Sequence, residues 1–94
     1  MDFIDFSGYV MIEFYGEGCF NCQMMAPIIN NLESRFPRIR FYRINADQHS
    51  DLIHRYQITS LPSLLLFRNG KLLTTIIGMK TQSVLERIIN DWLI

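Results

Sequence analysis

The chain has 94 residues, no net formal charge and 49% hydrophobic residues, which favours one globular domain over residues 1–94. A domain of this size buries roughly 60–70% of its unfolded surface, so it needs neither disulfides nor a structural metal to fold. The balanced charge argues against binding to nucleic acid or an anionic membrane, and no apolar run approaches the ~20 residues that span a bilayer.

The first half of the chain predicts a strand, a helix and a second strand. Residues 9–15 form an apolar, β-prone run that ends in a Gly-Glu-Gly segment, as in a buried strand. An apolar stripe at helical spacing over residues 25–36 predicts a helix that is kinked at Pro27 and stops at Pro37. Residues 39–44 predict the second strand.

The second half predicts a short helix, a hairpin and a last helix. The short helix is expected to carry Leu52, Ile53 and Tyr56 on one side, and strands follow over residues 63–68 and 71–77. An Asn-Gly pair between these two strands is a strong signal for a two-residue hairpin turn. Thr81 is a suitable N-cap for the last helix, which carries an apolar stripe.

The resulting order of elements is βαβαββα, which predicts an α/β fold. The βαβ units favour parallel strands joined by right-handed crossovers, and the hairpin adds an antiparallel edge. Because the strands are apolar on both faces, we expect helices on both sides of a central mixed sheet of four strands. Residues 1–6 offer a possible fifth strand at the edge.

The two cysteines of the chain, Cys19 and Cys22, lie between the first predicted strand and the first helix. A cysteine at a helix N-terminus lies beside unpaired backbone N–H groups and the positive end of the helix dipole, which favour the thiolate. Cys19 comes first and should be the more exposed, so it is the candidate nucleophile. Cys22 lies one turn later and is the candidate resolving cysteine.

Two other uses of these cysteines are less consistent with the sequence. A purely structural pair is disfavoured, because a disulfide across so short a loop adds little stability. Zinc ligation with His49 and His54 is also disfavoured, because Cys22 is farther from His49 than the roughly 12–15 residues of a zinc finger. The two histidines are five positions apart and face different directions on a helix, so we expect solvated side chains and no metal site.

At this point the chain resembles the thioredoxin family over most of its length. Residues 10–15 resemble the strand that leads to the active site, and Cys19-Phe-Asn-Cys22 stands where the family has Cys-Gly-Pro-Cys. Residues 56–70 (Tyr-Gln-Ile-Thr-Ser-Leu-Pro-Ser-Leu-Leu-Leu-Phe-Arg-Asn-Gly) are the closest match, and Gly78 matches the glycine after the last strand. The resemblance implies a three-layer thioredoxin-like fold and a thiol–disulfide oxidoreductase that reduces protein disulfides.

The resemblance also implies roles for residues outside the cysteine pair. The Leu61–Pro62 bond is expected to be cis, to face the cysteines and to present the Leu61 backbone to an extended substrate. Gly78 is assigned to the same substrate-binding site. Glu13 stands near the family's buried aspartate, so it is a candidate base for Cys22. Arg43 either tunes Glu13 or lies on the surface.

Three departures from the family pattern leave the direction of electron flow open. Gly18 and Tyr15 replace the active-site tryptophans, and Phe20-Asn21 replaces the Gly-Pro pair of strongly reducing members. Phe20 should be exposed beside Cys19 and supply apolar contact to a substrate. A more oxidising, partner-specific oxidase or isomerase and a non-redox binding module therefore remain alternatives.

The resemblance also implies partners, whereas the expected location follows from the N-terminal residues. The expected partners are protein disulfides and a recycling reductase such as thioredoxin reductase, with no bound cofactor, because the disulfide itself stores the electrons. Too few residues precede Tyr9 for the strand and helix that usually come first, so strand 39–44 is expected at an edge. This predicts a monomer or a weak homodimer paired through that edge. The acidic start at Asp2 favours the cytoplasm over secretion.

Overall fold

The strands and helices follow one another in the predicted order. A computed structural model describes residues 3–93, and every predicted strand forms within one residue of its expected bounds. Beyond the prediction, one 3₁₀ turn precedes the short helix. The elements are β1 (Tyr9–Tyr15), α1 (Phe20–Arg35), β2 (Ile39–Asn45), η1 (Ala46–Gln48), α2 (Ser50–Arg55), β3 (Ser63–Arg68), β4 (Lys71–Ile77) and α3 (Gln82–Trp92).

The sheet is mixed and has four strands in the order β2-β1-β3-β4. β1 runs parallel to β2, with Met11 opposite Phe41, and antiparallel to β3, with Met11 opposite Leu66. β3 and β4 form the hairpin that the Asn-Gly pair predicts. β1, the strand that precedes the cysteine pair, therefore lies inside the sheet, where both of its backbone edges are paired.

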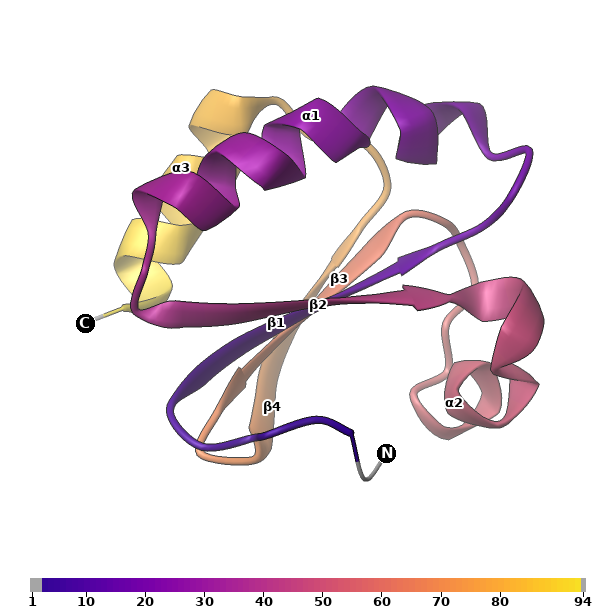
Figure 1. Cartoon of the computed structure of the whole chain (residues 1–94), viewed down its shortest axis with the longest axis horizontal. Coiled ribbons are helices and arrows are strands. Elements are labelled where there is room, and N and C mark those ends of the chain that lie inside the picture. Colours follow the sequence, from indigo (N-terminus) through magenta and orange to yellow (C-terminus); the bar gives the residue numbers. More distant parts are fainter. Residues whose placement is uncertain (1–2, 94) are drawn as a thin grey trace.

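The three layers expected from the apolar strands are present. Figure 1 shows α1 and α3 on one face of the sheet and α2 with the N-terminal segment on the other. One core packs Met11, Leu64 and Leu66 against α1 and α3, and a second core packs Phe14 and Leu65 against α2. None of the described helices is long and apolar enough to cross a membrane.

The possible fifth strand is not formed by the described part of the N-terminus. Residues 3–8 contain no strand, while Met1 and Asp2 of the predicted segment lie outside the described residues. The physical reason is a local turn, because the Asp5 carboxylate accepts hydrogen bonds from the N–H and the hydroxyl of Ser7 at 3.0 and 2.7 Å. The segment instead crosses beside β2, where Asp5 pairs with Arg40 at 3.4 Å.

Thr81 caps α3 as predicted, since its hydroxyl oxygen accepts a hydrogen bond from the N–H of Val84 at 3.3 Å. We expect Thr81→Ala to lower the free energy of unfolding by about 1 kcal/mol, because it leaves an orphan N–H at the helix start. Urea denaturation measures the change. Ser34→Ala, at an exposed position in the last turn of α1, is the matched control, and an equal loss in both variants would contradict the capping role.

Candidate functional site

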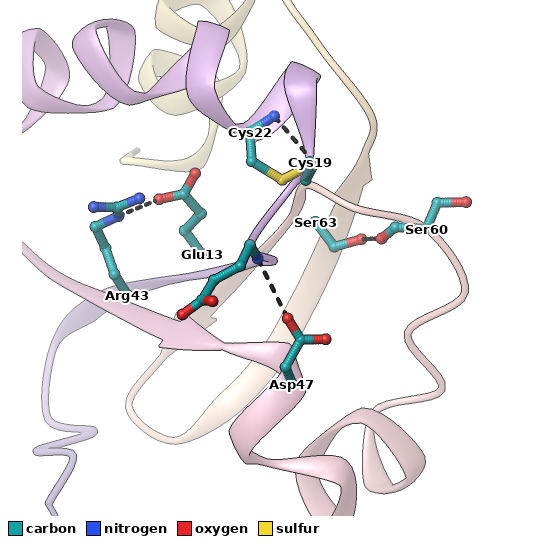
Figure 2. The surroundings of a disulfide bond; sticks show 8 residues. Glu13, Cys19, Cys22, Arg43, Asp47, Ser60 and Ser63 are labelled. Carbon is teal, nitrogen blue, oxygen red and sulfur yellow. Dashed lines mark hydrogen bonds and ion pairs between the residues drawn. A yellow bond between two sulfur atoms is a disulfide. The ribbon is translucent and has the colours of Figure 1, made fainter.

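Cys19 and Cys22 lie at the start of α1, just after β1 ends, and they form a disulfide in this structure. Cys19 is the N-cap of α1, and its Sγ accepts a hydrogen bond from the N–H of Cys22 at 3.2 Å (Figure 2). Cys19 is half-buried, whereas Cys22 is only 3% exposed. Cys19 is thus the more accessible of the two residues, and the helix start offers an N–H group and a positive dipole end to a thiolate there.

Glu13 lies beneath α1, on the same face of the sheet as the cysteine-bearing helix. Side chains alternate along a strand, and Met11, two residues earlier, belongs to the core under α1 and α3. Glu13 is 1% exposed, and its Oε2 has no hydrogen-bond partner among residues 3–93. Burial raises the pKa of Glu13, while the hydrogen bond from Arg43 opposes that rise. A carboxyl of this kind is able to exchange a proton nearer neutral pH than an ordinary glutamate.

Arg43 is paired with Glu13 rather than free on the surface, which resolves the two options that the sequence left open. Its Nε donates a hydrogen bond to Glu13 Oε1 at 2.8 Å (Figure 2). The guanidinium also lies over the ring of Tyr15, 4.5 Å from the ring centre. Tyr15 was not predicted in this role. The register of β1 and β2 would have predicted this contact, because Glu13 is directly opposite Arg43 and Tyr15 is two residues further along β1.

The Leu61–Pro62 bond is cis, as expected, and the loop that contains it approaches the cysteines. Gly16 lies between this loop and Cys19. A β-carbon at Gly16 would lie 2.9 Å from Leu61 Cδ1 and 4.0 Å from Cys19 Cβ, so both side chains border the same point. Gly78 reaches the loop from the other side, because its N–H donates to the Pro62 carbonyl at 2.8 Å. The structure therefore brings together the loop, Gly78 and the first cysteine.

Phe20 occupies the first helical position directly after Cys19 and is 70% exposed. Met24, one turn later on the same helix face, is also exposed. No charged residue occurs between Glu17 and Glu33, so the surface next to the disulfide on α1 is apolar or neutral. Phe20 is thus placed beside Cys19, as predicted.

The histidines do not approach the cysteines to form a metal cluster. His54 is exposed on α2, and His49 is partly covered, with its ring 6.2 Å from that of Phe3. Within residues 3–93, no group of three His, Cys, Asp or Glu side chains is placed to hold a metal ion. The solvated position expected of His49 is therefore only half correct, because Phe3 shields one side of its ring.

The chain is similar in sequence and structure to thioredoxins. The thioredoxin family profile matches residues 3–91. A thioredoxin of Chlamydia pneumoniae is 34% identical over 84 residues, which are 89% of this chain and 82% of that protein. Thioredoxin-1 of Saccharomyces cerevisiae is 30% identical over 84% of this chain and 77% of its own. The oxidised crystal structure of mitochondrial thioredoxin 3 from the same yeast superposes with a TM-score of 0.84, at 30% identity, over 90% of this chain and 79% of that one.

The fold, the disulfide at the start of α1 and these relatives define the class of protein: a thiol–disulfide oxidoreductase. Within that class, the chain belongs to the thioredoxin family. The non-redox binding module is not favoured, because both cysteines are present and close enough to be bonded, with their Cα atoms 5.3 Å apart.

Proposed function

We propose that the protein reduces disulfides in other proteins, with Cys19 as the nucleophile and Cys22 as the resolving cysteine. The observation that carries the proposal is the difference in burial between the two cysteines. Cys19 caps α1 at the surface and Cys22 is buried one turn inside the helix. Attack on a bulky partner needs an accessible thiolate, whereas resolution is intramolecular and tolerates burial.

The exchange balances in two steps. The Cys19 thiolate attacks one sulfur of the substrate disulfide, that bond breaks, and the other substrate sulfur leaves as a thiolate that takes up a proton. Cys22 then loses its proton and attacks Cys19 Sγ, which forms the Cys19–Cys22 disulfide and releases the second substrate thiol. Two electrons have moved to the substrate, and a reductase that delivers two electrons must regenerate the dithiol.

Glu13 accepts the proton of Cys22 in the second step. It lies on the α1 side of the sheet, is nearly inaccessible to solvent and has one carboxylate oxygen without a hydrogen-bond partner in the described chain. Burial raises the pKa of this carboxyl, which suits a base that takes a proton from a thiol and gives it up again near neutral pH. Arg43 holds the carboxylate in place through its hydrogen bond, and the guanidinium of Arg43 itself packs over the ring of Tyr15.

The substrate lies along the loop that contains the cis bond. Among residues 3–93, neither the N–H nor the C=O of Leu61 takes part in a hydrogen bond, so both are available to an extended peptide. Pro62 and Gly78 fix the position of this segment through the hydrogen bond between them. Phe20 supplies an apolar contact on the other side of Cys19.

A redox titration of the Cys19/Cys22 couple tests the direction of electron flow. We expect a reduction potential near the roughly −270 mV of thioredoxin, together with reduction of insulin disulfides. The Phe20-Asn21 pair is the feature that favours the opposite role. A potential near the roughly −120 mV of a strong oxidant, with no insulin reduction, would replace the reductant by the oxidase or isomerase alternative.

A further inference from the structure

A pocket of about 430 Å³ opens between the η1–α2 segment and the loop that precedes β3. Its walls are largely apolar, with Ile53, Ile58 and Leu61 among the lining side chains. Among residues 3–93, Asp47 is the one charged residue that lines it. The combination of an apolar wall and a single carboxylate differs from the neutral surface of α1 on the other side of the disulfide.

The pocket is continuous with the proposed substrate site. The point where a Gly16 β-carbon would stand is 2.9 Å from Leu61 Cδ1, 3.8 Å from Asp47 Oδ2 and 4.0 Å from Cys19 Cβ. Leu61 therefore belongs both to the pocket wall and to the loop that receives substrate. Figure 2 shows Ser60 on this loop and Asp47 on η1, with the disulfide above Asp47 at the start of α1. A peptide bonded to Cys19 brings neighbouring side chains to the pocket.

The carboxylate of Asp47 is fixed without being neutralised. Its Oδ2 accepts a hydrogen bond from the backbone N–H of Glu17 at 3.3 Å, and no cation forms an ion pair with it among residues 3–93. The side chain of Glu17 adds a second negative charge nearby, where its Oε1 accepts from Asn45 Nδ2 at 3.4 Å. The local field thus favours a positive group at the pocket.

We infer that this pocket binds a lysine or arginine side chain that neighbours the reactive cysteine of the substrate. The methylene groups of such a side chain pack on Ile53, Ile58 and Leu61, while its head group meets Asp47. The assignment rests on the proposed reduction of protein disulfides and specifies its substrate class: disulfides flanked by a basic residue. An acidic residue at the same place is repelled by Asp47.

Reduction of three matched peptide disulfides tests the assignment. The peptides differ at one position beside the cysteine, which carries lysine, norleucine or glutamate, and kcat/KM is measured for each with the full chain. We expect the lysine peptide to react about fivefold faster than the glutamate peptide, and the ratio to shrink between 0.05 and 0.5 M salt. Asp47→Asn keeps an oxygen for the Glu17 N–H, and we expect it to bring the ratio close to one.

Asp51→Asn is the matched control, because Asp51 is an exposed acid on α2 that does not line the pocket. It should keep the preference for lysine. Asp47→Lys provides a second variant, for which the order of the lysine and glutamate peptides should reverse. Equal rates for the three peptides would overturn the pocket assignment and leave disulfide reduction intact. If neither the peptides nor insulin were reduced, both the pocket and the proposed function would be overturned.

Discussion

Cys22→Ser is expected to accumulate a covalent complex between Cys19 and its substrate, whereas Cys19→Ser should form none. Serine at position 22 cannot attack the mixed disulfide, so the first exchange step proceeds and the second does not. Serine at position 19 removes the accessible thiolate, and the remaining cysteine is only 3% exposed. Insulin reduction should fall by at least about a hundredfold in both variants.

Non-reducing electrophoresis and mass spectrometry of the trapped species measure this difference. Each variant keeps one cysteine, so each is the matched control for the other. A complex linked through Cys22 in the Cys19→Ser variant, as abundant as the one linked through Cys19, would reverse the proposed roles. Because serine is close to cysteine in volume, both variants should fold, and circular dichroism checks that they do.

Glu13→Gln is expected to make the protein more stable and its second exchange step slower. Ionised Glu13 is a buried charge, and its partner Arg43 is 46% exposed and can be solvated when the pair is lost. Replacing the carboxylate by a neutral amide of the same shape should therefore raise the free energy of unfolding by about 1 kcal/mol at pH 8. Loss of the base should slow the resolving step by at least about tenfold.

The pH dependence of stability gives the sign of the effect. Burial raises the folded-state pKa of Glu13 above the ordinary value of 4.5. At a pH between 4.5 and this raised pKa, Glu13 is ionised in the unfolded chain but still protonated in the folded chain. Stability therefore falls as the pH rises through this range, and it levels off above the folded-state pKa. The excess stability of Glu13→Gln should therefore be smallest near pH 4 and grow to its full value above the folded-state pKa.

Urea denaturation across pH and stopped-flow measurement of mixed-disulfide resolution test these two effects. Glu86→Gln is the matched control, because Glu86 forms an ion pair with Arg35 at 3.2 Å in which the side chains of Arg35 and Glu86 are 60% and 21% exposed, against 1% for Glu13. It should change stability by less than about 0.5 kcal/mol, with no effect on the exchange rate. A Glu13→Gln variant that is less stable at pH 8, or that resolves at the normal rate, would remove Glu13 from the proposed role.

The sequence predicted the order and bounds of the strands, because their signals are local. The apolar run over residues 9–15 and the Asn-Gly pair before residues 71–77 specify a buried strand and a hairpin through neighbouring residues alone. The N-cap at Thr81 is equally local. Residues 3–6 show where the same reasoning fails, since the side chain of Asp5 closes a turn that competes with strand pairing.

In the candidate site, too, some features follow from local sequence and others depend on tertiary contacts. Position alone put Cys19 at a helix start, with Cys22 one turn behind it, and this was enough to predict a redox pair. The partner of Glu13 depended on strand register, because Arg43 lies thirty residues away in the chain and directly opposite in the sheet. The contact between Tyr15 and Arg43 required the same register and the direction of a side chain at the sheet edge.

By itself, the sequence determined the class of chemistry, because two cysteines three residues apart at the start of a helix lie one helical turn from each other. Only the tertiary structure decided what surrounds them. The close approach of Leu61 and Asp47 to Gly16 joins three segments that are distant in the chain, and no local pattern encodes their meeting. Long-range packing thus sets the environment of Glu13 and the shape of the pocket beside Leu61, whereas the local sequence sets the spacing of the two cysteines.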